Sequence, residues 1–243
     1  MAVLGTNYTA RQQLPDLIER GRDNTLQAPI YTAGALVAPT SGTITVYDNS
    51  SVAVVDAAAV TISASVAQYT IVNATTAALS LSDSWRVEWS LVMPDGVTHS
   101  HRTEAALVRS APHMPITDAD LFRISSALDP SGAAAITSET DFQNYLDESW
   151  VQIQSRLIER GRRPWLIISP AALRESALYL TLALIYEDLA TRLSDTYEQR
   201  AERYRAQYEA AWQRLRVAYD ADDDGTADDG RRSVAPTVWL SGR

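Results

Sequence analysis

Apolar and polar residues alternate along the chain from about residue 25 to residue 112. In the stretch "WRVEWSLV" the apolar residues fall on every second position, namely Trp85, Val87, Trp89 and Leu91. A period of two is typical of a β-strand with one buried face. The stretches "GTITVYD", "SVAVVD", "AVTISASV" and "QYTIVNA" follow the same pattern between Ser, Asn and Asp breaks. Region 25–112 is therefore predicted to form an antiparallel β-sandwich of immunoglobulin-like size.

Two further features frame this region. The turn "MPDG" joins the clearest pair of strands, because Pro94 fixes φ and Gly96 tolerates a positive φ. Before the sandwich, "LPDLIERGRDN" indicates a short amphipathic helix that stops at Gly21, within an N-terminal arm, 1–24. The hexapeptide "LIERGR" recurs at 157–162, and we interpret the repeat as shared capping, since the flanking sequences differ.

The period changes to three and four residues after the two prolines of "SAPHMPITDAD". Two pairs of polar residues have the spacing of a capping box and predict helices over 117–128 and 138–160: Thr117 with Asp120, and Ser138 with Asp141. Gly161 is expected to end the second helix. Ser169 and Pro170 suit the N-cap and first position of a third helix. These elements define a predicted α-helical bundle over 113–219.

The third helix is the longest element that the sequence predicts. Apolar residues keep steps of three and four through 169–219, and a single helix of that length would measure about 75 Å. The shorter helices cannot cover it, so either the helix breaks near "TRLSDT" or its far end projects. Its second half carries a narrow aromatic stripe on a charged cylinder, formed by Tyr197, Tyr204, Tyr208 and Trp212. We expect this stripe to meet a neighbouring subunit, the alternative being that it folds back onto the chain's own helices.

The acidic stretch "DADDDGTAD" begins where the helical pattern ends, and 220–243 is predicted to be an acidic hinge followed by an extended tail. Four carboxylates and a glycine match the opening positions of a calcium loop: Asp220, Asp222, Asp224, Gly225 and Asp228. The twelfth position should hold an acid, yet it is Arg231. The pattern therefore favours weak, millimolar calcium binding or a solvated hinge over a tight calcium site.

Other candidates for chemistry are few. His99 and His101 lie on one face of a predicted strand, a spacing that metal sites use, but a structural or solvent-facing pair fits as well. No nucleophile elbow, phosphate-cradling glycine loop or HExxH motif occurs. The sequence therefore predicts a protein that is not an enzyme and needs no cofactor.

Composition and charge limit the classes of partner that the protein is expected to bind. The net charge of −9 is spread along the chain and no segment is basic, which argues against a module that binds nucleic acid through its phosphates. The chain has no cysteine, which excludes disulfides and thiolate metal sites. Neither a signal sequence nor an apolar run of about 20 residues is apparent, so we expect synthesis in the cytoplasm and no contact with a membrane.

The final segment "RRSVAPTVWLSGR" carries apolar residues beyond the acidic stretch: Val234, Val238, Trp239 and Leu240. It is expected to add to a partner as a strand or to insert into a partner's groove, the alternative being a segment without fixed structure.

Taken together, the capped short helices, the long tyrosine-rich helix, "DADDDGTADD" and the short tail resemble head–tail connector (adaptor) proteins of tailed bacteriophages and gene transfer agents. The resemblance covers about 113–243 and implies a structural virion protein of the neck. Such proteins form a homo-oligomeric ring, usually of twelve copies, below the portal protein, and the opposite face receives tail or stopper proteins. The tail 231–243 would then face the portal, and helix 169–219 would line or buttress the channel. An acidic chain suits a channel through which DNA passes without specific binding.

One rival from another class stays open. A β-sandwich with an acidic loop on a helical stalk would also suit a calcium-dependent surface or adhesion module. That hypothesis predicts export of the protein, whereas no export signal is visible in the sequence.

Overall fold

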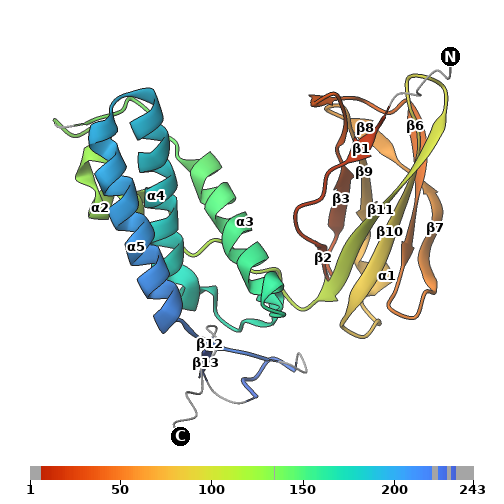
Figure 1. Ribbon diagram of the computed structural model, residues 1–243. Coiled ribbons are helices and arrows are strands. Elements are labelled where there is room, and N and C mark those ends of the chain that lie inside the picture. The colour runs from red at the N-terminus through yellow and green to blue at the C-terminus, as the bar shows by residue number, and fades with distance from the viewer. Residues whose placement is uncertain (1–6, 134, 221–223, 229–230, 234–243) are drawn as a thin grey trace, which may run out of the picture. The chain divides into compact units, whose positions relative to one another are not determined.

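The structure is a computed structural model that describes residues 7–133, 135–220, 224–228 and 231–233. The chain divides into two compact units, Met1–Ala111 and Pro112–Arg243. The first unit is rich in β-strands and the second carries the long α-helices (Figure 1). The predicted α+β organisation, with β-structure first and helices after it, is thereby confirmed.

Residues 7–111 of the first unit form three sheets. The largest has the order β2-β11-β10-β6-β7, with bounds Asp16–Glu19, Thr98–Val108, Ser82–Val92, Ser41–Tyr47 and Ala53–Ala59. A second has the order β3-β9-β8, with bounds Asn24–Ala28, Val66–Ile71 and Thr61–Ser63. The third has the order β1-β4-β5, with bounds Thr9–Ala10, Ile30–Thr32 and Ala35–Leu36. A single helical turn, α1 (Asn73–Thr76), precedes β10. Strand neighbours are antiparallel except for β2 and β11, which are parallel.

One apolar core joins these sheets. The predicted alternation along β10 is confirmed, because the four apolar side chains on alternate positions are at most 2% exposed: Trp85, Val87, Trp89 and Leu91. The same core contains Leu26 of β3, Ile30 of β4 and Ile44 of β6. The turn between β10 and β11 also forms as predicted. Gly96 has a φ of 78°, and its N–H donates to the carbonyl of Met93 at 2.8 Å.

Residues 7–24 do not form a separate arm, contrary to the prediction for 1–24. β1, β2 and the first residue of β3 lie there, and the stretch predicted as a helix is the strand β2, paired with β11 from Asp16 opposite Ala105 onward. Ile18 explains the outcome, since its side chain is fully buried in the core of the sheets. Just before β2, the side-chain amide of Gln12 donates to the carbonyl of Glu104 and accepts from its N–H, both at 2.8 Å. The Gln12 side chain thus makes the pair of hydrogen bonds to Glu104 that the backbone of a neighbouring strand would make.

The part of the second unit that the structure describes contains four α-helices and a small β-ladder. The helices are α2 (Asp118–Ile124), α3 (Gln143–Glu159), α4 (Arg174–Arg192) and α5 (Glu198–Arg214). Short 3₁₀ turns span Ser126–Leu128, Pro164–Leu166, Pro170–Leu173 and Asp195–Tyr197. After α5, β12 (Arg216–Ala218) pairs antiparallel with β13 (Arg231–Ser233). α4 and α5 run side by side as a helical hairpin (Figure 1), and one apolar core joins them to α2 and α3.

The single long helix predicted over 169–219 is wrong, and the alternative of a break within "TRLSDT" is correct. α4 ends at Arg192, and Ser194 adopts an extended conformation with φ −170° and ψ 142°. The hydroxyl of Ser194 accepts a hydrogen bond from Thr196 N–H at 3.3 Å and so begins the next helical segment. Folding back at this point allows α5 to bury its apolar stripe against α4.

The predicted helix ends have mixed outcomes. The capping box of Thr117 and Asp120 is present, although α2 ends before the predicted limit at 128 and a 3₁₀ turn follows. The capping box at Ser138 is wrong, because α3 begins only at Gln143, whose N–H donates to the carboxylate of Asp141 at 2.8 Å. Gly161 ends α3 with a φ of 69°, as predicted.

Candidate interaction site at the end of the helical hairpin

The aromatic stripe of α5 is largely internal to the chain, which overturns the argument for a subunit interface built on it. Trp212 is fully buried and Tyr208 is 4% exposed, while Tyr197 and Tyr204 are partly buried against the same core. The ring of Tyr204 stacks on that of Tyr186 of α4, with centroids 5.5 Å apart. The prediction failed because it assumed an unbroken helix, which would have left the stripe without cover.

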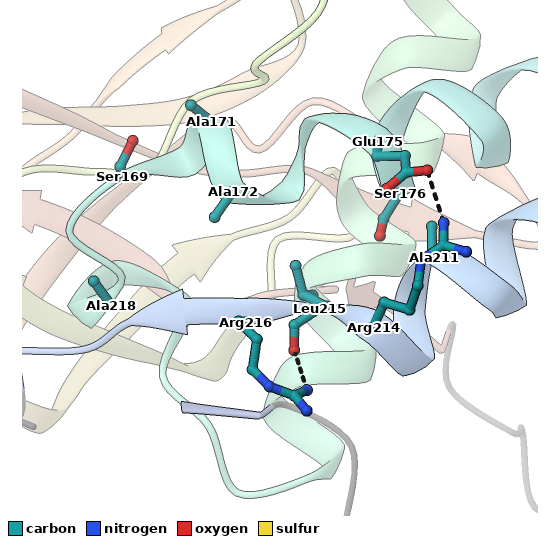
Figure 2. Close-up of a pocket in the computed structure, with 10 residues that line it drawn as sticks. All are labelled: Ser169, Ala171, Ala172, Glu175, Ser176, Ala211, Arg214, Leu215, Arg216 and Ala218. Atoms are coloured by element: carbon teal, nitrogen blue, oxygen red, sulfur yellow. Dashed lines mark hydrogen bonds and ion pairs between the residues drawn. The ribbon is translucent and has the colours of Figure 1, made fainter. Parts of the chain in front are cut away.

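A pocket of about 530 Å³ lies where α4 begins and α5 ends (Figure 2). Six of its ten lining residues have small side chains: Ser169, Ala171, Ala172, Ser176, Ala211 and Ala218. They come from the 3₁₀ turn before α4 and its N-cap residue, the first turn of α4, the last turn of α5 and β12. Because these side chains are short, the two ends of the helical hairpin meet without filling the space between them.

Charged groups surround this floor of small residues. Arg214 of α5 reaches across to Glu175 of α4 in an ion pair of 2.9 Å, and both side chains are more than half exposed. The guanidinium of Arg216 donates to the carbonyl of Leu215 at 3.2 Å, as the dashed line in Figure 2 marks. The lining therefore combines small uncharged side chains with two guanidinium groups and one carboxylate.

The β-ladder brings a second part of the chain to this pocket. Arg216, which lines the pocket, is the partner of Ser233 in the antiparallel register. The four residues predicted to bind the portal follow Ser233 and lie outside the described residues: Val234, Val238, Trp239 and Leu240.

The acidic loop uses part of its predicted ligand set for its own structure. Asp220 is 4% exposed, and its carboxylate accepts hydrogen bonds from the N–H groups of Asp224 at 2.9 Å and Gly225 at 2.6 Å. Asp224 in turn accepts from Thr226 N–H at 2.7 Å. Asp228 donates its N–H to the carbonyl of Tyr219, whereas Asp222 lies outside the described residues.

In the part of the chain that the structure describes, no group of three or more His, Cys, Asp or Glu side chains is arranged to hold a metal. That part lacks Asp222, so weak calcium binding by the loop stays a prediction. In β11, His99 packs edge-on against Tyr8 at 4.9 Å, and burial together with the neighbouring His99 lowers the pKa of His101. His99 thus has a structural contact within the first unit.

Sequence reasoning missed one titratable group and the pocket itself. Asp16 lines a second cavity of about 210 Å³ in the first unit, and burial raises the pKa of its carboxyl to about 6. No motif signals this, because the burial depends on the pairing of β2 with β11. The pocket of the second unit had a weak signal in the small residues that follow Pro170, whose partners across the pocket could not be inferred.

Within the described residues, no helix is both long and apolar enough to cross a membrane. No family model, curated protein or solved structure matches the chain.

Proposed function

We propose that the chain is a structural virion protein, a head–tail connector that joins the capsid portal to the tail. The observation that carries the proposal is the layout at one end of the helical unit. There the last turn of α5, the β12–β13 ladder and the pocket adjoin one another, and the polypeptide continues beyond Ser233 with ten more residues. A scaffold that delivers a terminal segment from a defined site matches the resemblance, which assigns portal binding to that segment.

In this proposal the three sheets of the first unit act as a β-sandwich that contacts tail or stopper proteins or decorates the neck. The four helices act as the bundle that forms the body of the connector. Copies associate in a ring, for which the resemblance implies twelve, and DNA passes through the ring without specific binding. The net charge of −9 supports that last role, because an acidic wall repels the phosphates of DNA.

Contacts between copies must use surfaces other than the aromatic stripe, since Tyr208 and Trp212 are buried within one chain. Among its described residues, the helical unit exposes three large apolar side chains that are available for this purpose: Ile124, Ile168 and Leu193. Each is more than 40% exposed. The proposal of a ring is therefore based on the resemblance. Substitutions at these three positions are the first test of whether they lie between copies.

Mixing the purified chain with the portal protein encoded in the same genome tests the proposal. We expect electron microscopy and native mass measurement to show several copies of the chain on one end of the portal. A chain that ends at Ser233, and the single variant Trp239→Ala, should lose this binding. Val52→Ser, which alters an exposed side chain of the first unit, serves as the matched control.

Two outcomes would contradict the proposal. One is the absence of any complex with the intact chain at concentrations well above those of a specific complex. The other is undiminished binding by the chain that ends at Ser233, because the terminal segment would then have no part in the contact.

A further inference from the structure

We propose that the cavity around Asp16 in the first unit binds a guanidinium group, supplied either by a small organic cation or by an arginine side chain of a partner protein. This inference does not depend on the head–tail role, since it follows from one cavity and the side chains that line it.

The pairing of β2 with β11 turns two polar side chains towards the interior of the first unit. Asp16 and Ile18 lie two residues apart on β2 and therefore share one face, and Ile18 is fully buried. On β11, Ala105 lies opposite Asp16, and Thr103, on the same face as Ala105, is only 8% exposed. A carboxyl and a hydroxyl thus lie on the inner side of the sheet.

Asp16 and Thr103 both line a cavity of about 210 Å³. Its ten lining residues come from β1, β2, β3, β11 and the segments next to them. A water molecule occupies about 30 Å³, so this volume has room for about seven waters or for one small organic group. Six of the lining residues are polar or charged: Arg11, Gln12, Gln13, Asp16, Gln27 and Thr103. The lining is therefore suited to a polar group.

The hydrogen bonds of the described residues leave part of the acceptor capacity unused. One carboxylate oxygen of Asp16 accepts from the side-chain amide of Gln12 at 3.3 Å, and the same amide donates to the carbonyl of Glu104 at 2.8 Å. The buried hydroxyl of Thr103 makes no hydrogen bond. The side chain of Arg11 is exposed, and among the described residues no ion pair joins it to Asp16. Because buried carboxylates are normally paired, a cation that donates hydrogen bonds would complete this site.

The energetics of Asp16 support a role other than stability. Burial raises the pKa of its carboxyl to about 6, against a smaller opposing effect of Thr103, whose hydroxyl does not reach hydrogen-bond geometry. At pH 7 the carboxylate is ionised although the folded chain favours the neutral acid, so it lowers the stability of the first unit. Titratable groups held in such an unfavourable state are found at binding and catalytic sites more often than elsewhere.

A guanidinium group fits this site better than a metal ion does. Asp16 is the one carboxylate among the lining residues, whereas calcium and magnesium sites use several oxygen ligands. A guanidinium group presents several N–H donors in one plane, which suits acceptors on two neighbouring strands. It is also weakly hydrated for a cation, so that less free energy is lost when it leaves water.

Titration of the full-length chain with methylguanidinium tests the proposal. The NMR shifts of backbone amides on β3 and β11 report binding, with the ionic strength held constant. We expect shifts that saturate with a dissociation constant in the millimolar range, since a ligand this small makes few contacts. Tetramethylammonium is the matched probe, because it has the same charge and a similar size but no N–H donor. It should bind at least about tenfold more weakly.

Asp16→Asn tests the carboxylate directly. This variant is expected to be more stable than the parent chain at pH 7, so a loss of binding would not reflect misfolding. Methylguanidinium should then cause no saturable shift. Asp56→Asn removes an exposed carboxylate of β7 outside the cavity and is the matched control, which should bind as the parent chain does. Thr103→Val keeps the side-chain shape without the hydroxyl and should weaken binding about fivefold.

The pH and the form of the probe supply two further comparisons. Lowering the pH from 7 to 5 should weaken binding about tenfold, because Asp16 becomes protonated; Arg11 is the other charged residue in the lining. N-acetylarginine amide that binds at least as tightly as methylguanidinium would assign the cavity to an arginine side chain of a partner protein. Binding of methylguanidinium alone would assign it to a small cation.

Three outcomes would each overturn the proposal. They are shifts that do not saturate, an equal response to tetramethylammonium, and undiminished binding by Asp16→Asn.

Discussion

Arg156 of α3 and Glu209 of α5 form a two-pronged ion pair in which both N–O distances are 2.8 Å. The same guanidinium lies 4.5 Å from the ring centroid of Trp212, so one side chain links two helices through charge and through an aromatic face. The hydrogen bonds from Arg156 are the main cause of the lowered pKa of Glu209.

A double-mutant cycle with Arg156→Ala and Glu209→Ala measures this link. Glu209 is nearly half exposed, so solvent screens the pair and the expected coupling is about 0.5–1 kcal/mol. Urea unfolding at pH 7 supplies the four free energies. Because the pKa of folded Glu209 is lowered, the coupling should persist above its ordinary value of 4.5 and disappear as the pH falls through the folded pKa. The more exposed Arg214–Glu175 pair is the control and should show a smaller coupling.

Trp212→Ala should lower the free energy of unfolding by about 3–5 kcal/mol, because it empties a fully buried site in the core of the helical unit. Chemical denaturation followed by circular dichroism is the measurement. Tyr197→Ala, which removes a partly buried ring from the same stripe, should cost markedly less. Equal and small effects of the two substitutions would restore the view that the stripe is a surface for other molecules.

Asp16→Asn should stabilise the first unit at neutral pH. Burial raises the pKa of Asp16 from 3.8 to about 6, so the folded state binds the proton more tightly than the unfolded state. Stability from this group is fully present below about pH 3.8 and is lost as the pH rises to about 6. We expect a gain of about 1–2 kcal/mol at pH 7 that vanishes near pH 4, measured by urea unfolding across this range. A gain independent of pH would show that the carboxyl titrates normally.

Calcium should change the melting temperature very little. Asp220 already accepts two backbone hydrogen bonds, and Arg231 occupies the position of the final acidic ligand. With a dissociation constant near 1 mM, calcium at 1 mM would stabilise the protein by only about 0.4 kcal/mol. Differential scanning fluorimetry with calcium, and with magnesium as the matched ion, makes the comparison. A calcium-specific stabilisation of several kcal/mol would favour the adhesion module instead.

The two copies of "LIERGR" show how far local sequence determines structure here. At 17–22 the hexapeptide forms part of β2 and a turn, whereas at 157–162 it ends α3. Gly21 and Gly161 nevertheless have nearly the same φ, 73° and 69°. The glycine conformation was therefore predictable from the residue itself. The element before it depends on its partners, which are β11 in one copy and the preceding helical turns in the other.

The candidate site was less accessible to prediction than the fold. Alternation in β10 and the capping box of Thr117 are local patterns, and both are found. The pocket brings Ala172 and Ala211 into one lining, which depends on the break at Ser194. Apolar spacing continues through that break, so the pattern alone could not choose between one long helix and two antiparallel ones.

The contact between Gln12 and Glu104 has a consequence for solubility. Backbone pairing of β11 with β2 begins only at Ala105, and the Gln12 amide occupies the polar groups of the preceding residue. Gln12→Ala would leave the N–H and carbonyl of Glu104 unpaired at the edge of β11, just before the point where β2 begins to pair with it. Unpaired backbone groups at a sheet edge can pair with strands of other molecules. We therefore expect the Gln12→Ala variant to self-associate more readily, which would appear as turbidity on mild heating at a temperature below that of unfolding.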